Sequence, residues 1–325
     1  YGQLVIFVSS ATISEHDIFE KNTTSVVERF KNFPVNIELV NRFTSTKDLN
    51  RIKEGYVDVL NPFNNKQANR ISLKKENVEC FVFWTKNPKP LLERINELNG
   101  YNYYFQFTLN SYGKDIEPNV PSKNGEIIET FINLSNKIGK EKVIWRYDPI
   151  ILTDKYTIEY HIKYFEKLAE KLYKYTNKCV ISFLDLYKKT EKNMKHIKLD
   201  ELSMEKMNII AEQFSKICKK YNLELATCCE AIELEKYDIK HNKCIDDELI
   251  EKLFNIELIN KKRDKQRELC GCIKCNDIGA YNTCLHNCVY CYANFNKDQS
   301  EINSSKNDIN SSTLIGKISD DVKIY

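Results

Sequence analysis

Three cysteines near the C-terminus have the spacing of metal ligands. They are Cys284, Cys288 and Cys291, a C-x3-C-x2-C pattern in which Tyr290 directly precedes the last cysteine. Cysteine thiolates are the usual protein ligands of iron-sulfur clusters, and a cluster of four irons requires four ligands. Three cysteines in one loop leave one iron without a protein ligand, and an open coordination position is where a substrate or cofactor binds. The pattern therefore predicts a 4Fe-4S cluster with one open iron.

The composition favours a cytoplasmic protein that binds metal. Lys and Arg number 49 against 46 Asp and Glu, and no basic block indicates a nucleic-acid surface. We expect neither export nor membrane insertion, because no signal-like segment opens the chain and no apolar run approaches the ~20 residues of a membrane span. Nine of the 12 cysteines lie between residues 228 and 291. Clustered thiols in a reducing compartment indicate metal ligation rather than disulfides.

The elements that must position this loop follow a βα order. From residue 79 onward, short β-rich runs alternate with amphipathic stretches, and several runs are apolar on both faces, as in a parallel sheet covered by helices. We therefore predict an α/β fold with a partial or near-closed parallel β/α barrel of the TIM-barrel type. The predicted strands are 79–84, 103–108, 143–147, 179–184 and 223–227, and the predicted helices lie near 90–98, 125–139, 156–176 and 203–221.

Polar residues follow the ends of these strands. In a β/α barrel the carboxyl ends of the strands form the mouth of the active site, although each such residue could also be a helix cap or a loop residue. Arg146 could clamp a carboxylate or phosphate, Asp148 could position it or take a proton, and Lys86 could supply a counter-charge. The candidate catalytic residues are Lys86, Arg146, Asp148, Asp185 and Glu230, and Gln106 is expected to line the same mouth and contact the cofactor.

Several ordered stretches resemble a bacterial family known as domain-of-unknown-function family 1848, which is noted for C-terminal cysteines like those of radical-SAM proteins. The resemblance extends from about residue 50 to the end of the chain. The stretches that carry it are 51–57 with 61–64, 83–88, 104–109, 116–121, 145–149, 181–185 and 277–284.

The C-x3-C-x2-C spacing itself resembles the cluster loop of the radical-SAM enzymes, in which S-adenosylmethionine chelates the open iron. The resemblance implies S-adenosylmethionine as a cofactor, with Tyr290 beside its adenine. It also implies a reductase or a ferredoxin- or flavodoxin-type electron donor. The substrate, a small molecule or a macromolecule, is not indicated.

The order of the elements suggests a circularly permuted barrel of this type. Radical-SAM barrels usually carry the cluster loop after the first strand, so residues 277–281 would be the first strand and 36–41 the second. The end of the second strand helps hold the amino group of S-adenosylmethionine in that superfamily. Asn41, Arg42 and Thr44 are therefore candidate cofactor contacts, although this segment lacks the acidic residue of the family's Ser-Arg-Arg-Thr-Asp motif.

The remaining cysteines permit a second metal site. Cysteines also occur in the family at the positions of Cys228, Cys244, Cys270 and Cys272, and four thiolates could hold a second iron-sulfur cluster or a structural zinc. Cys229 and Cys275 are interpreted as extras. A zinc ribbon is an alternative, because the pairs 272/275 and 288/291 are separated by 12 residues. That interpretation leaves Cys284 without a role.

The combined prediction is an iron-sulfur enzyme of radical-SAM type. Three alternatives stay open, namely a zinc-binding structural or interaction protein, a nucleic-acid repair lyase resembling spore photoproduct lyase, and an inactive relative of the radical-SAM enzymes. We divide the chain into an unassigned segment at 1–34, a barrel at 35–268, a cluster-binding region at 269–296 and a polar tail at 297–325. Within the first segment Gln3–Ser9 is predicted to be a strand and Glu15–Phe33 a helix, and residues 297–312 are predicted to be a linker.

Overall fold

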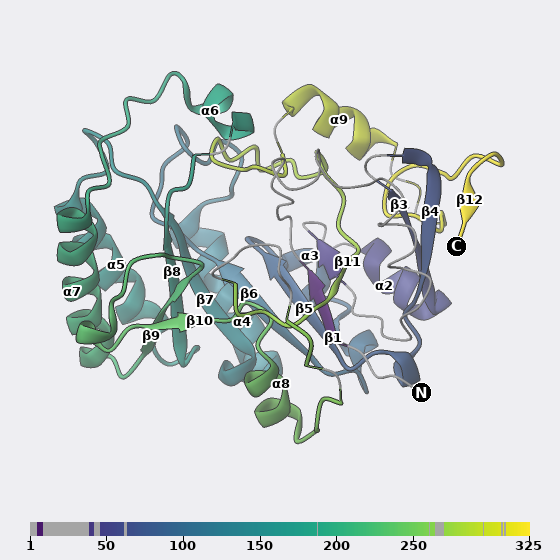
Figure 1. Ribbon diagram of the computed structural model, residues 1–325, viewed down its shortest axis with the longest axis horizontal. Coiled ribbons are helices and arrows are strands. Elements are labelled where there is room, and N and C mark those ends of the chain that lie inside the picture. The colour runs from purple at the N-terminus through teal and green to yellow at the C-terminus, as the bar shows by residue number, and fades with distance from the viewer. Residues whose placement is uncertain are drawn as a thin grey trace.

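A parallel β-sheet organises the molecule (Figure 1). The computed structural model describes residues 5–8, 39–41, 46–61, 64–186, 188–259, 261–263, 270–294, 296–306, 308 and 310–325. Nine strands form the sheet within these residues, and all its strand pairs are parallel. In spatial order they are β10 (Lys240–Asn242), β9 (Glu224–Cys228), β8 (Lys178–Phe183), β7 (Val143–Ile150), β6 (Tyr103–Thr108), β5 (Cys80–Thr85), β1 (Val5–Val8) and β11 (Asn276–Asp277), while β2 (Leu39–Asn41) also pairs with β5.

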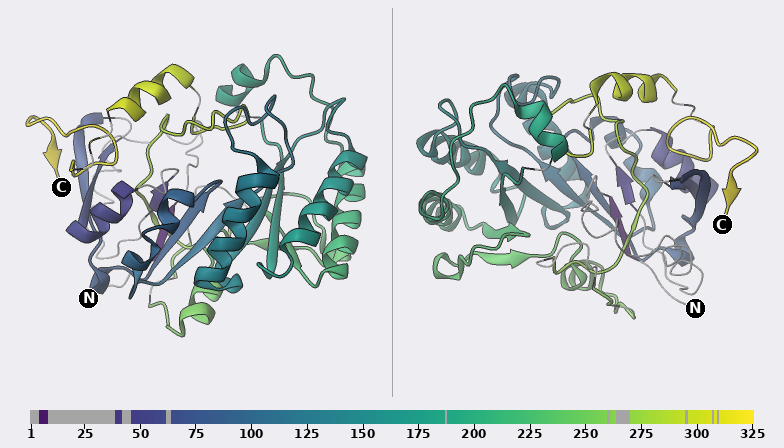
Figure 2. Two further views of the ribbon diagram at one scale, coloured as in Figure 1. Left: turned by 180° about the vertical axis from the view of Figure 1, so that it is seen from behind. Right: turned by 45° about the horizontal axis from the view of Figure 1, so that its top comes forward.

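One layer of helices covers one face of this sheet, as Figure 2 shows from behind. The layer consists of α4 (Ile128–Ile138), α5 (Ile158–Leu172) and α7 (Met204–Lys220). The helix α5 packs against both α4 and α7, which in turn lie against β7 and β9. Ser203, the predicted helix start, caps α7 by accepting a hydrogen bond from Lys206 N.

The strands are apolar toward the helices and partly polar on the other face, because successive side chains of a strand point in opposite directions. In β7, Trp145 stacks on Phe165 of α5 at 4.9 Å between ring centroids, and Tyr147 contacts Phe214 of α7 at 5.6 Å. Arg146 lies between these two residues and therefore points to the face opposite the helices. That face receives the cysteine-rich segment.

The other elements surround this core. A second, three-stranded sheet pairs β3 (Tyr56–Asn61) with β4 (Asn64–Ser72) in antiparallel fashion and adds β12 (Lys323–Ile324) in parallel. It stands at the side of the molecule away from β9 (Figure 1). The remaining helices are α2 (Thr46–Glu54), α3 (Lys89–Leu92), α6 (Lys188–Met194), α8 (Asp247–Phe254) and α9 (Lys297–Ser305). None of the described helices combines the length and apolarity needed to cross a bilayer.

The structure confirms the α/β class and all five strands predicted between residues 79 and 227. The sheet is open rather than closed, because β10 and β11, at the two ends of the strand order, do not pair with each other within the described residues. The predicted strand at 277–281 is reduced to β11, which pairs with β1, whereas β2 pairs with β5. The short strand β1 is observed where 3–9 was predicted, and the helix predicted at 15–33 lies outside the described residues.

The linker predicted over residues 297–312 is wrong for its first part, which forms α9. Asn296 caps this helix by accepting a hydrogen bond from Gln299 N, and the buried Ser300 donates to Asn294 Oδ1 at 2.7 Å. The sequence of α9 has no amphipathic period, because polar hydrogen bonds rather than an apolar stripe hold this helix in place. The periodicity of apolar residues therefore could not reveal it.

Candidate metal centre

The cysteine loop, residues 284–291, is docked on the segment that follows β6. Asn119 N donates to the carbonyl of His286 at 3.1 Å, and Val289 N donates to the carbonyl of Ile116 at 3.0 Å. The loop is thereby held against a segment that lies after the carboxyl end of a central strand, although the two are far apart in sequence.

One buried asparagine holds the loop in shape. Asn294 is only 4% exposed, and its Nδ2 donates to the carbonyl of Cys284 at 2.8 Å and to Asn287 Oδ1 at 3.0 Å. Within the loop, Cys291 N donates to the carbonyl of Cys288 at 3.0 Å. The loop backbone is therefore fixed by contacts of the protein itself.

The three thiols differ in exposure and in their electrostatic surroundings. Cys288 is buried, whereas Cys284 and Cys291 are partly exposed. Burial raises the pKa of the Cys288 thiol, and the nearby Lys86 ammonium opposes that rise. Lys86 thus favours the thiolate form that a metal requires.

The spacing of the sulfurs matters for the kind of metal they could hold. Among the described residues, the one set of three His, Cys or carboxylate side chains whose ligand atoms all lie within 4.8 Å of one another is the exposed group Glu233, Glu235 and His241. No three cysteine sulfurs of the described chain meet this condition. Around a single tetrahedral zinc, with Zn–S bonds of about 2.3 Å, sulfurs lie about 3.8 Å apart. In a cluster each sulfur binds a different iron, so a cluster does not require three sulfurs at this mutual spacing.

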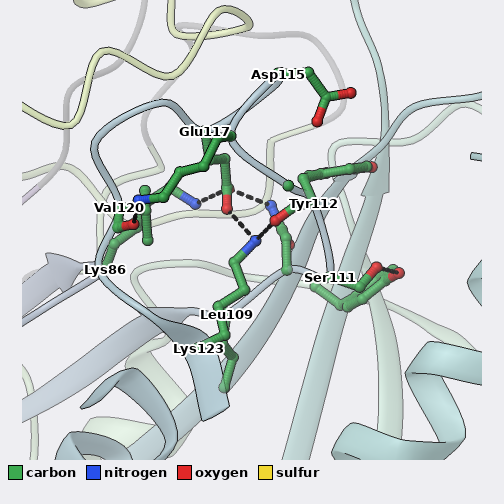
Figure 3. A network of polar contacts seen from close by, with 12 residues as sticks. Lys86, Leu109, Ser111, Tyr112, Asp115, Glu117, Val120 and Lys123 are labelled. Atoms are coloured by element: carbon green, nitrogen blue, oxygen red, sulfur yellow. Dashed lines mark hydrogen bonds and ion pairs between the residues drawn. The ribbon is translucent and has the colours of Figure 1, made fainter. Parts of the chain in front are cut away.

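A buried carboxylate joins the loop to the ends of the strands (Figure 3). Glu117 accepts from Lys86 Nζ at 2.9 Å and lies 2.6 Å from Lys123 Nζ, with its own side chain 1% exposed. Burial by itself would raise the pKa of Glu117, but the two ammonium groups lower it to about 2. Glu117 is therefore an anion that pairs with two cations beneath the loop.

The predicted cofactor residue Tyr290 takes part in the same network. Its hydroxyl donates to Glu117 Oε1 at 2.5 Å and accepts from Asn110 Nδ2 at 3.1 Å. Asn110 also donates to the carbonyl of Asp148 at 2.8 Å and accepts from Asp148 N at 2.8 Å. Sequence reasoning did not assign a role to Glu117 or Lys123, although Glu117 lies within one of the stretches that carry the family resemblance.

The structure brings the predicted residues Arg146 and Asp148 together. Arg146 is 1% exposed, and its Nε donates to Asp148 Oδ2 at 2.8 Å, with a second bond from Nη2 to the same oxygen. Burial would lower the pKa of Arg146, but Asp148 and nearby thiols raise it. The guanidinium carbon lies 4.2 Å above the centroid of the Trp84 ring, and Nη1 donates to Cys244 Sγ at 3.4 Å. The guanidinium is thus engaged by the protein itself and by a second cysteine group.

Two other predicted catalytic residues follow neighbouring strands, Asp185 after β8 and Glu230 after β9. Glu230 Oε1 accepts from Phe183 N at 2.8 Å, and burial together with the neighbouring Asp185 charge raises its pKa to about 8. Asp185 is exposed. Glu230 is therefore the predicted residue with a protonation state that changes near neutral pH.

Of the other predicted cofactor contacts, the structure describes Gln106 and Asn41. Gln106 is 1% exposed and its Nε2 donates to the carbonyl of Cys244 at 3.0 Å, while its Oε1 has no hydrogen-bond partner in the described chain. Asn41 ends β2 and pairs with Trp84 across the sheet. Arg42 and Thr44 lie outside the described residues.

The cysteines outside the loop form a second group. Cys228 Sγ and Cys244 Sγ are 2.8 Å apart, and Cys272 Sγ accepts from Cys244 N at 3.2 Å. The Cys272 thiol therefore belongs to this group, whereas Cys288 neighbours the other loop thiols. The two cysteine pairs of the zinc-ribbon alternative accordingly lie in different groups.

Comparison with known proteins places these features in a family. A family model described as "Domain of unknown function (DUF1848)" matches residues 40–293. A stretch of 63 residues is 40% identical to a transcription-repair-coupling factor of Staphylococcus haemolyticus (strain JCSC1435), and the match covers 18% of this chain and 5% of that protein. The chain thus spans about a twentieth of the length of this relative. No solved structure matches the chain.

Proposed function

The chain belongs to the DUF1848 family, and we propose that it is an iron-sulfur enzyme of the radical-SAM type. The observation that carries the proposal is the cysteine loop, which is docked on the segment after β6 and places Cys288 beside Lys86, with Cys284 and Cys291 as neighbours of Cys288. When bound, a cluster with an open iron supplies one-electron chemistry, namely reductive cleavage of S-adenosylmethionine to a radical that abstracts hydrogen from a substrate.

The residues of the chain have separate tasks in this proposal. Cys284, Cys288 and Cys291 ligate the cluster as thiolates. Lys86 favours the Cys288 thiolate by its charge, and Glu117 holds Lys86 in place through the 2.9 Å ion pair. Such a buried pair orients groups beside a reacting centre without reorganisation.

The parallel strand pairs and the helix layer on one face support the α/β part of this proposal, and the permuted partial barrel stays part of the proposal. The residues engaged at its carboxyl edge, Arg146, Asp148 and Glu230, line the substrate side in our proposal. Glu230, with a pKa of about 8, is the residue suited to exchange a proton with substrate near neutral pH. The division into a barrel at 35–268 and a cluster-binding region at 269–296 belongs to the same proposal.

Cleavage of S-adenosylmethionine tests the proposal directly. The protein is reconstituted anaerobically with iron and sulfide, then given dithionite and S-adenosylmethionine, and 5'-deoxyadenosine is quantified by chromatography. We expect the wild-type chain to form it and Cys288→Ala to form none. Cys218→Ala is the matched control, because Cys218 is a buried thiol of α7 outside both cysteine groups.

Two results would contradict the proposal. One is the absence of 5'-deoxyadenosine from a wild-type sample that has taken up iron. The other is equal formation by wild type and Cys288→Ala, since a cluster on the cysteine loop cannot form normally without its buried ligand.

A further inference from the structure

We propose that Cys228, Cys244, Cys270 and Cys272 ligate a second, fully coordinated iron-sulfur cluster, separate from the one on the cysteine loop. The four residues come from three segments of the chain that meet on the sheet face opposite the helices. Cys228 ends β9, Cys244 follows β10, and Cys270 and Cys272 precede β11.

The thiols of this region form a closed ring. Cys228 Sγ and Cys244 Sγ are 2.8 Å apart, and each thiol of the ring interacts with two neighbouring thiols. None of the twelve cysteines, all of which the structure describes, is in a disulfide. The ring contains the four proposed ligands and Cys229. Five thiols directed at one another pack no better than apolar side chains would, whereas converging sulfurs are what a metal centre requires. The order around the ring is Cys228, Cys244, Cys272, Cys270, Cys229 and back to Cys228.

Hydrogen-bond donors already point at the sulfurs. Cys272 Sγ accepts from the backbone N–H groups of Cys244 at 3.2 Å and Ile245 at 3.4 Å. Cys244 Sγ accepts from Arg146 Nη1 at 3.4 Å. Donors of this kind stabilise the charge of ligating thiolates and tune the potential of a cluster. Arg146, which is buried and also pairs with Asp148, supplies a positive charge next to these thiols.

The spacing favours a cluster over a single zinc ion. No three sulfurs of the ring lie mutually within 4.8 Å, whereas the sulfurs around one tetrahedral zinc would all lie about 3.8 Å apart. The 2.8 Å contact between Cys228 Sγ and Cys244 Sγ has to lengthen for either centre, and in a cluster each sulfur then binds its own iron. Four thiolates complete the coordination of a four-iron cluster and leave no iron open to a substrate.

Cys229 is the thiol that we leave out of the ligand set. It directly follows Cys228 in the chain, and its neighbours in the ring are Cys228 and Cys270. Cys228 is also the member of this pair that contacts Cys244, the ring member next to Arg146. Cys229→Ala is consequently a matched control for substitutions of the ligands.

Metal analysis of variants tests this inference without any activity measurement. Each protein is reconstituted anaerobically, desalted, and assayed for iron, acid-labile sulfide and zinc per chain. We expect roughly eight irons for the wild type and for Cys229→Ala, because each of two clusters holds four. The triple variant C284A/C288A/C291A and the variants Cys244→Ala and Cys272→Ala should each retain roughly four.

The outcomes separate this inference from the proposed function. If the triple variant retains no iron, or if it holds zinc, the second cluster does not exist. Loss of iron from Cys229→Ala would overturn the assignment of the four ligands. If the triple variant keeps all the iron of the wild type, the second site stands and the cluster on the cysteine loop fails. The triple variant leaves the ring intact, so the test holds even where the ring variants do not fold.

Discussion

Replacement of Glu117 by glutamine tests whether one buried negative charge fixes the surroundings of the cysteine loop. The amide of glutamine has nearly the size of the carboxylate but no charge. The variant would leave Lys86 and Lys123, with side chains 17% and 18% exposed, facing a neutral partner. Removal of one partner from a buried ion pair costs about 3–5 kcal/mol.

The pKa of Glu117 gives a second estimate of how much its charge contributes to the free energy of unfolding. The pKa of Glu117 falls from its ordinary 4.5 to about 2 in the folded protein, because Lys86 and Lys123 outweigh the effect of burial. Each pH unit of this difference corresponds to about 1.4 kcal/mol, so the charge contributes on the order of 3 kcal/mol. The folded-state value is the lower one, so this contribution is present above pH 4.5 and is lost as the pH falls toward 2.

Urea unfolding of the metal-free protein, followed by circular dichroism, measures the effect. At pH 7 we expect Glu117→Gln to lower the free energy of unfolding by about 3 kcal/mol, and the difference should shrink at pH 3. The matched control is Asp115→Asn. Asp115 pairs with Lys155 at 2.9 Å, but the side chains are 46% and 61% exposed. An exposed pair of this kind contributes only about 0–1 kcal/mol.

Either of two results would refute this reasoning. A loss below about 1 kcal/mol at pH 7 would show that the charge of Glu117 does not stabilise the two lysines. A difference between wild type and Glu117→Gln that is as large at pH 3 as at pH 7 would mean that the amide perturbs packing rather than charge.

Two further predictions concern the loop and the helix layer. Asn294→Ala removes the donor to the Cys284 carbonyl. We expect the free energy of unfolding to fall by about 1–3 kcal/mol and the reconstituted protein to hold less iron per chain. Unchanged iron content would argue against a preformed loop. His161, hydrogen-bonded to Tyr147 at 2.8 Å and to the Ile151 carbonyl at 2.9 Å, has its pKa lowered to about 4 by burial. Its folded-state pKa lies below the ordinary 6.5, so unfolding free energy should fall by about 3 kcal/mol between pH 6.5 and 4; an equal fall in His161→Gln would contradict the assignment.

Much of the fold could be predicted from the sequence because the strands of a covered parallel sheet are continuous apolar runs. β6 and β8 are of this kind, and their bounds agree closely with the predicted ranges. Elements held by polar contacts gave no such pattern. The helix α9 depends on the cap at Asn296 and on buried Ser300, so its composition indicated a linker.

The candidate site shows the same division. Lys86, Arg146 and Asp148 were found because Lys86 follows β5 and the other two lie in the carboxyl-terminal part of β7, and strand ends lie at one edge of a parallel sheet. Glu117 and Lys123 lie in loops or at a helix start, where position along the chain gives no information about neighbours. Their partners are set by the path of the segment after β6.

The sequence by itself determined the three-cysteine loop and the alternation of strands and helices, because ligand spacing and hydrophobic periodicity are properties of adjacent residues. Only the tertiary structure decided that the sheet stays open, that Glu117 pairs with Lys86 beneath the loop, and that Cys244 meets Cys272 beside Arg146. Those contacts join residues separated by many positions in the chain. Many side chains in the sequence could pair with one another by charge or chemistry. The packing of the whole chain selects the pairs that form, and the local sequence does not encode that selection.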